Sequence, residues 1–463
     1  MKRVAWRIYY RCRIAYHRLK PSYALLIGYS LYVLTTFALL CLPICRNVAD
    51  VPLIDILFTS LAAISTSGLQ TVNFTETYSI FGQVVVLIGI QISGLGYMTL
   101  GSFIILASKG HLSKKRLKIG QAVLAMPDSF NPVKFLRHII IFTFAIELIG
   151  ALILWKCFMA AGVSNPLWAA VFHAVTAFCT AGISIFPNSL TEFADNPAIT
   201  LTVAGLCLLG GIGFIVLDDL YRSVKTKSIT ATLTTKIILF ATFGSVLLGT
   251  VFLFFDPNLA GFSLDKRLLA AFFQTVSALT TAGFHTIPVS NLAAATLVII
   301  IVLMILGASP SGTGGGLKTT TWSAAVATVL SFFRGKDEIT FFGKTVPHSR
   351  TTAAFAAITL YMTTFALGTY CLLLFSTHSF ESVVFEVASA LGNVGLSHGI
   401  TPELCIGGKI VIMLLMYIGR LGVLSLALGA IALYHDISAD LRIFHHAEIP
   451  LPEEEPTEDD IVV

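Results

Sequence analysis

Long apolar runs separated by short polar segments set the hydrophobic pattern of this chain. Eight runs stand out, at residues 22–44, 80–107, 139–155, 198–217, 237–255, 293–306, 353–375 and 410–433. A helix needs roughly 20 mostly apolar residues to cross the hydrocarbon core of a bilayer. The pattern therefore predicts eight membrane-spanning helices.

Composition indicates that lipid is the solvent of these helices. Charged residues make up 12% of the 463 residues and hydrophobic residues 56%, whereas soluble proteins carry about 25% charged residues. Because the deficit extends along the whole sequence, we expect an all-α membrane protein with the lipid bilayer as a partner.

The distribution of Lys and Arg gives an orientation. Eight spans place both termini on one side, and 22 of the 30 Lys and Arg residues fall on that side, against five on the other. The positive-inside rule then predicts that both termini are cytoplasmic and that the chain crosses the cell (inner) membrane several times. The net charge of +5 follows from this topology, so no nucleic-acid partner is expected.

A motif of twelve residues occurs four times. The copies are FTSLAAISTSGL, FHAVTAFCTAGI, FQTVSALTTAGF and FEVASALGNVGL, which align without gaps and carry glycine at the eleventh position. These glycines are Gly68, Gly182, Gly283 and Gly395. Each copy lies between two long apolar runs, and its own apolar stretch of about 12 residues is too short to span a bilayer.

The repeat predicts four tandem units, each made of a helix, a re-entrant pore loop and a second helix. The fold would then hold eight transmembrane helices and four pore helices in a pseudo-fourfold arrangement. We divide the chain into a basic cytoplasmic tail, four units and an acidic cytoplasmic tail, at residues 1–20, 21–108, 133–223, 233–333, 350–435 and 436–463.

The loops have the chemistry of a cation filter. Non-helical backbone at membrane depth is tolerated only where it faces protein or a water-filled cavity, and rings of backbone carbonyls can replace the hydration shell of a monovalent cation. We predict that a monovalent cation binds the residues at the end of each repeat: Thr66, Ser67, Gly68, Thr180, Ala181, Gly182, Thr281, Ala282, Gly283, Asn393, Val394 and Gly395.

With these motifs the chain resembles the Trk/Ktr/HKT superfamily of potassium transporters, and most closely a Ktr-type membrane subunit. The resemblance implies channel-like potassium uptake through one filter per subunit, a homodimer, and a separate cytoplasmic nucleotide-binding regulatory ring. Some members carry Ser at the first filter glycine and prefer sodium, so Gly68 favours potassium. The fourth loop departs from the Thr pattern with Gly392 and Asn393.

Three functional alternatives stay open at this point. A sodium-selective or mixed transporter would have the same architecture, and an intramembrane enzyme or a scaffold is a remote alternative. We expect no covalently bound cofactor, with potassium as the substrate and sodium as a coupling or regulatory ion. Asp218 and Asp219 argue against a protease pair, because adjacent residues on a helix point in different directions.

A glycine-rich segment interrupts the second helix of the third unit. The sequence ILGASPSGTGGGLKTTT contains Gly312, Gly314, Gly315, Gly316 and Lys318. A nucleotide-binding P-loop requires Gly directly before Lys, and Leu317 stands between them here. We interpret residues 307–318 as an intramembrane loop, and the resemblance implies that it is a gate.

Polar residues within the apolar runs are further candidates. By resemblance Arg420 lies in the pore below the filter, as a barrier to cations or as a partner of loop carbonyls and an acidic residue. Thr59, His173, Gln274 and Glu386 share one position of the repeat and are predicted to brace neighbouring helices. Glu147 either pairs with Lys156 or affects transport.

Overall fold

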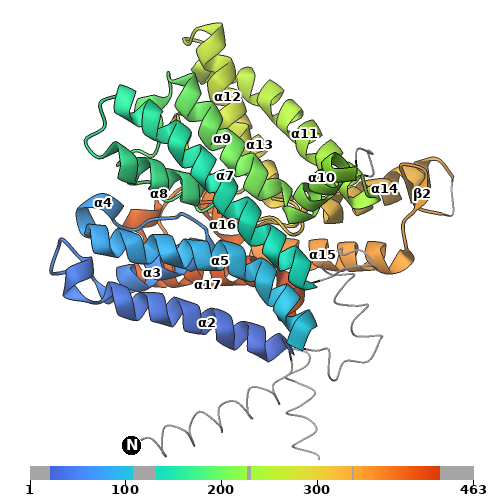
Figure 1. Ribbon diagram of the computed structural model, residues 1–463, viewed down its shortest axis with the longest axis horizontal. Coiled ribbons are helices and arrows are strands. Elements are labelled where there is room, and N and C mark those ends of the chain that lie inside the picture. The colour runs from blue at the N-terminus through green and yellow to red at the C-terminus, as the bar shows by residue number, and fades with distance from the viewer. Residues whose placement is uncertain (1–20, 108–131, 227–230, 336–337, 428–463) are drawn as a thin grey trace, which may run out of the picture.

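The computed structural model describes residues 21–107, 132–226, 231–335 and 338–427. The two predicted tails and the basic segment at residues 109–118 lie outside these described residues. The described chain is mostly helical and has one two-stranded antiparallel sheet (Figure 1).

The α-helices follow one another in the order expected for four repeated units. They are α2 (Pro21–Leu40), α3 (Leu53–Ser65), α4 (Phe74–Thr77), α5 (Ile80–Ala107), α7 (Pro132–Ala160), α8 (Pro166–Phe178), α9 (Pro197–Ile212), α10 (Phe214–Thr226), α11 (Leu233–Phe254), α12 (Leu264–Leu279), α13 (Ala294–Leu306), α14 (Thr319–Phe333), α15 (His348–Phe375), α16 (Phe380–Gly392) and α17 (Ile406–Leu421). The strands are β1 (Thr340–Phe341) and β2 (Lys344–Thr345), and short 3-10 helices lie at Pro43–Cys45, Thr191–Phe193, Pro257–Leu259, Val289–Asn291 and Thr401–Glu403.

Four short apolar helices, α3, α8, α12 and α16, lie at the centre of four helix groups. Within each group the short helix packs against the helix before it and the helix after it. Group one consists of α2, α3 and α5; group two of α7, α8 and α9; group three of α11, α12 and α13; and group four of α15, α16 and α17. The short helices are buried along most of their length, because their Ala, Val and Phe side chains face other helices.

The groups contact one another in a closed cycle. The last helix of each group packs on the short helix of the next: α5 on α8, α9 on α12, α13 on α16, and α17 back on α3. Segments at opposite ends of the sequence are therefore neighbours, and α3 and α17 lie close together in Figure 1. The cycle directs the ends of all four short helices toward a common centre.

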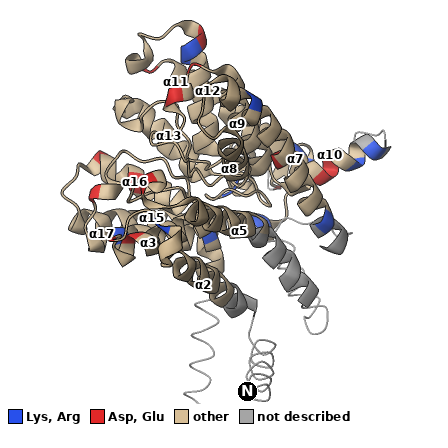
Figure 2. Ribbon diagram, turned by 60° about the vertical axis from the view of Figure 1, so that its left-hand side comes forward, with Lys and Arg blue, Asp and Glu red and all other residues tan. Residues whose placement is uncertain are grey.

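Among the described residues, three helices are long and apolar enough to cross a membrane: Arg137–Ala160, Leu233–Phe254 and His348–Phe375. A fourth candidate is the pair Pro197–Ile212 and Phe214–Ser223, which bends by 93° at Gly213. The positions of Lys, Arg, Asp and Glu lie mainly toward the ends of the helices (Figure 2). The prediction of eight spanning helices exceeds what length and composition establish for these residues.

Candidate functional site

Each short helix ends in the same backbone motif. In each group a residue two or three positions past the helix end donates its backbone N–H to the carbonyl five residues earlier: Ser67 to Ala62 at 2.9 Å, Ala181 to Thr176 at 2.8 Å, Ala282 to Ser277 at 2.9 Å and Val394 to Ser389 at 2.8 Å. This bond defines a Schellman motif, which satisfies carbonyls that the helix leaves open. In all four groups the motif turns the backbone out of the short helix in the same way.

The residue that makes this turn has a left-handed backbone in every group. Thr66, Thr180, Thr281 and Asn393 have φ of 53°, 51°, 57° and 52°. A positive φ is unusual for a β-branched residue such as threonine, while asparagine tolerates it. Three strained threonines at equivalent positions indicate that the surrounding contacts impose this conformation, a feature that often accompanies functional sites.

The four glycines of the repeat come together in a closed ring, which we call the glycine ring. A Cβ added to any of them would lie within 3.0 Å of a carbonyl oxygen of the next loop. The facing pairs are Gly68 with Ala181, Gly182 with Ala282, Gly283 with Val394, and Gly395 with Ser67. Only glycine fits such an approach at positive φ. The twelve residues predicted for the filter are thus brought to one place.

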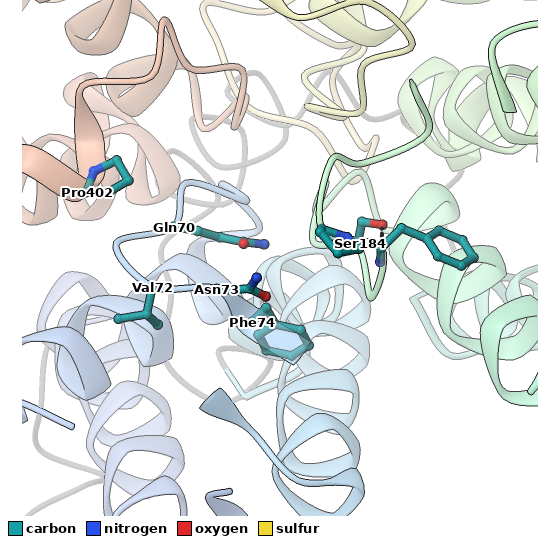
Figure 3. A pocket seen from close by; sticks show the side chains of 8 residues that line it. Gln70, Val72, Asn73, Phe74, Ser184 and Pro402 are labelled. Atoms are coloured by element: carbon teal, nitrogen blue, oxygen red, sulfur yellow. Dashed lines mark hydrogen bonds between the residues drawn. The ribbon is translucent and has the colours of Figure 1, made fainter. Parts of the chain in front are cut away.

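A pocket opens beside the ring where the chain leaves it. The pocket has a volume of about 210 Å³ and is lined by residues from three groups: Gln70, Val72, Asn73, Phe74, Ser184, Phe186, Pro187 and Pro402. Figure 3 shows Gln70 and Ser184 at this pocket, one from the first loop and one from the second. The chain that follows Gly68 and Gly182 therefore reaches an open, mostly neutral surface.

Residues 307–318 form a buried loop between α13 and α14. Gly307 ends α13 with φ of 68°, and Gly316 has φ of 75° and packs against it. Lys318 extends over the loop and donates from Nζ to the carbonyls of Gly314 at 2.5 Å and Gly315 at 3.2 Å. These bonds satisfy backbone groups that have no helical partner.

The loop also bonds to the bend between α9 and α10. Ser309 and Thr313 donate their backbone N–H to the carbonyls of Gly211 and Gly210, at 3.0 and 3.1 Å. In the other direction, the backbone N–H of Phe214 donates to the carbonyl of Ser311 at 3.2 Å. The bend and the loop thus complete each other's hydrogen bonding.

The same loop lies against the ends of the short helices. Thr313 donates its hydroxyl to the carbonyl of Phe178 at 2.9 Å, and the Thr180 hydroxyl donates to Thr313 Oγ1 at 3.2 Å. The backbone N–H of Gly315 donates to Thr281 Oγ1 at 2.8 Å. A Cβ on Gly315 would collide with the carbonyl of Gly392. The loop therefore touches the second, third and fourth groups directly.

Arg420 connects the loop to the first group. The side chain is 4% exposed, and its Nη1 donates to the carbonyl of Thr313 at 2.7 Å and to Thr66 Oγ1 at 2.8 Å. Its Nη2 donates to the carbonyl of Ser93 at 2.9 Å. These acceptors are neutral oxygens. Of the two predicted roles for Arg420, pairing with a loop carbonyl agrees with this geometry.

Several predicted polar partners differ from the structure. Glu147 accepts from Gln91 Nε2 at 3.1 Å instead of pairing with Lys156. Nine residues separate Glu147 from Lys156, which is about two and a half helical turns, so the two lie on opposite faces of α7. His173 and Glu386 bond to serines of their own loops and not to neighbouring helices as predicted.

The two adjacent aspartates of α10, Asp218 and Asp219, take part in separate contacts. Asp218 pairs with Arg222 at 2.7 Å and with His138 at 2.7 Å. Asp219 accepts hydrogen bonds from Thr232 and Thr235 and thereby holds the start of α11. The two carboxylates therefore serve different structural contacts, as their adjacent positions on the helix predict.

Comparison with protein families gives one match that covers most of the chain. The family model described as TrkH, cation transport protein, matches residues 29–438. Several curated proteins are also similar over nearly their whole length. The Ktr system potassium uptake protein B of Bacillus subtilis is 33% identical over 418 residues, which is 89% of this chain and 93% of that protein.

A second relative and a solved structure extend the comparison. The potassium/sodium uptake protein NtpJ of Enterococcus hirae is 32% identical over 422 residues, 88% of this chain and 92% of that protein. The crystal structure of the potassium transporter TrkH from Vibrio parahaemolyticus aligns with a TM-score of 0.67 at 20% identity. It covers 89% of this chain and 85% of that chain. At this identity the likeness concerns the fold.

Proposed function

The chain belongs to the TrkH family of cation transport proteins, and we propose that it takes up potassium ions across the cell membrane through the centre of the glycine ring. The family places the chain in a membrane. The relatives similar over most of its length carry potassium uptake in their names, and this supports potassium as the substrate.

The closed contact between the four loops is the observation that carries this proposal. Each loop presents a backbone carbonyl to the glycine of the loop before it, so the four loops enclose one axis. Carbonyl oxygens arranged in rings can replace the water around a monovalent cation. The ends of the short helices add their partial negative charge at the same place, which favours a cation.

In this proposal the twelve residues predicted from the repeat form the selectivity filter, and the four groups are re-entrant pore units with eight membrane spans. Residues 307–318 form the gate, because they lie against the ends of the short helices. Both termini would be cytoplasmic. The proposed assembly is a homodimer that binds a cytoplasmic nucleotide-binding ring, with no covalently bound cofactor.

Ion flux in a bacterium that lacks its own potassium uptake tests the proposal. We expect the full chain to restore growth at low potassium and to take up rubidium, with and without a co-expressed cytoplasmic ring. The same strain expressing Gly182→Asp is the negative control, because we expect this variant to be expressed at the wild-type level without transporting rubidium. Sodium uptake without rubidium uptake, in folded wild-type protein, would reject potassium as the substrate.

Mixed or sodium-selective transport is the second candidate. One relative that covers most of this chain is named a potassium/sodium uptake protein. Sodium could act as substrate, coupling ion or regulator in the same pathway. Rubidium uptake measured against added sodium separates these cases, because a coupling ion stimulates uptake whereas a competing substrate inhibits it.

A further inference from the structure

Two residues of each repeat stand in a fixed relation to the ring glycine. One lies nine residues before the glycine, on the short helix, and the other lies two residues after it, on the chain that leaves the ring. The pairs are Thr59 with Gln70, His173 with Ser184, Gln274 with His285, and Glu386 with Ser397. The first member is buried in all four groups.

In the second group this pair forms a hydrogen-bonded clamp. His173 is fully buried, and its Nδ1 lies 2.8 Å from the carbonyl of Ala169, so Nδ1 carries the proton and donates. The neutral ring then has Nε2 as an acceptor, which receives the hydroxyl of Ser184 at 2.9 Å. Ser184 Oγ also accepts the backbone N–H of Phe186 at 3.0 Å.

The fourth group repeats the clamp with different chemistry. Glu386 is fully buried and accepts the hydroxyl of Ser397 on Oε1. Ser397 Oγ accepts the backbone N–H of Gly399 at 2.9 Å, two residues further on, as in the second group. An imidazole and a carboxylate thus serve as the same acceptor at equivalent positions.

The first and third groups have no equivalent hydrogen bond among the described residues. Thr59 donates to the carbonyl of Asp55 within its own helix at 2.9 Å. The Gln274 side chain is 2% exposed, and both of its amide atoms lack a hydrogen-bond partner in the described structure. In the third group the chain after Gly283 is held by different bonds. The Ser277 hydroxyl on α12 donates to the carbonyl of Phe284 at 2.5 Å, and the backbone N–H of Leu190 in the neighbouring loop donates to the carbonyl of His285 at 3.1 Å.

The clamp affects the shape of the glycine ring, because the backbone of glycine changes conformation easily. Gly182 and Gly395 have φ of 63° and 97° and could move between backbone conformations at low cost. The inner end of each loop is fixed by its Schellman bond to the short helix. The serine fixes the outer end to the same helix, so in these two groups the carbonyls between them are held from both sides.

From this arrangement we propose that Ser184 with His173, and Ser397 with Glu386, are positioning pairs that set the preference of the ring for potassium over sodium. The inference rests on the proposed filter. The second and fourth groups are not consecutive in the cycle, so the two clamps hold opposite sides of the ring. A ring held on opposite sides resists contraction around a smaller ion, and selectivity is a difference between two affinities.

The test measures the ratio of the potassium and sodium concentrations that each halve rubidium uptake, in cells expressing the full chain. Ser184→Ala and Ser397→Ala each leave a buried acceptor without its donor, and we expect each to reduce the preference for potassium about fivefold, as for loss of one buried hydrogen bond. Ser184→Thr and Ser397→Thr keep the hydroxyl and should keep the wild-type ratio.

Gln274→Leu is the matched control, because it changes the same repeat position in a group without a clamp. It should fold and keep the wild-type ratio. Glu386→Gln retains an acceptor oxygen for Ser397 and should also keep the ratio. The proposal would be overturned if both serine-to-alanine variants kept the wild-type ratio, or if Glu386→Gln reduced the preference for potassium over sodium.

Folding and the filter hypothesis are separated by two further measurements. Size-exclusion profiles and thermal unfolding in detergent identify variants that do not fold, and a purely structural clamp would lower stability while the ratio stays unchanged. If wild-type cells take up no rubidium, the proposed function fails. If they do, and the ratio is insensitive to the serines, only the clamp is rejected.

Discussion

The glycine ring repeats one backbone conformation four times, whereas the loop at residues 307–318 occurs once. In the ring, each short helix ends in the same hydrogen bond and each glycine faces a carbonyl of the next loop. In the loop, twelve residues that show no internal repeat are held by separate hydrogen bonds to α8, α9, Thr281 and Arg420.

This difference predicts opposite responses to substitution. Contacts in the ring are backbone against backbone, so an added side chain has no space and must distort the carbonyls. The loop also has backbone contacts, but several of its contacts are single side-chain hydrogen bonds, each replaceable at a cost of about 1 kcal/mol. If the ring selects ions and the loop closes the path, changes in the ring should abolish uptake and changes around the loop should increase it.

The largest effect is expected for Gly182→Asp. A Cβ at this position would collide with the carbonyl of Ala282, and a positive φ is strained for any side chain. Strain of about 3 kcal/mol in the conducting conformation corresponds to a loss of about a hundredfold in rate. Rubidium uptake in cells measures this loss, with surface expression as a reference.

Gly162→Asp is the control for backbone strain. Gly162 also has a positive φ, of 75°, but no atom of the described residues lies within 4 Å of an added Cβ. We expect near-normal uptake from this variant. Equal loss in both would show that the close approach of the loops has no special role.

The next effect concerns Arg420, and it distinguishes the two roles predicted from the sequence. Arg420→Lys keeps the positive charge but loses the planar fork that joins Thr66, Thr313 and Ser93. Charge-assisted hydrogen bonds contribute about 1.5–3 kcal/mol, so a loosened loop should raise uptake about tenfold. Arg420→Gln should raise it by a similar factor.

A pure charge barrier gives a different result. In that case Arg420→Lys would leave rubidium uptake unchanged, and only Arg420→Gln would increase it. Arg334→Lys, at the exposed end of α14, serves as the control for the substitution itself.

A smaller increase is expected for Thr313→Val. Valine keeps the volume of the side chain but removes the hydroxyl that donates to Phe178 and accepts from Thr180. Loss of about 1 kcal/mol from the closed state would raise the open population about fivefold. Thr328→Val is the control, since this hydroxyl donates within α14, to the carbonyl of Ala324. Unchanged uptake in Thr313→Val would place the gate elsewhere.

The sequence predicts the features of this site that depend on local geometry. The repeat locates the short helices, and the glycine at its eleventh position marks the point of close approach. At the start of α16, Ser379 is the N-cap, and its side chain accepts the backbone N–H of Ser382. Such features follow from backbone hydrogen bonding and recur wherever the local pattern recurs.

Side-chain partners from different groups could not be predicted in this way. Arg420 reaches Thr66, 354 residues away, because α17 packs on α3 at the closure of the cycle. The partners of His173 and Glu386 depend on where the chain turns after the glycine. The predicted pairing of Glu147 with Lys156 could have been excluded from the sequence, because helical geometry places residues nine positions apart on opposite faces of a helix.

The smallest effect is expected where the repeat itself is irregular, at Asn393. With its amide oriented so that the oxygen faces the N–H of Arg420, the side chain bridges two backbone groups of α17: Nδ2 donates to the carbonyl of Met416 at 3.0 Å and Oδ1 accepts the N–H of Arg420 at 2.8 Å. Those two groups are four residues apart and can bond to each other directly once the amide is removed. Asn393→Thr, which restores the residue of the other three loops, should therefore change rubidium uptake by less than about twofold.

Asn393→Gly separates backbone strain from loss of the amide, because glycine adopts the positive φ freely. A gain in uptake as large as that of Arg420→Lys in both variants would mean that Asn393 holds Arg420 in place, and the irregular position would then belong with the loop and not with the ring.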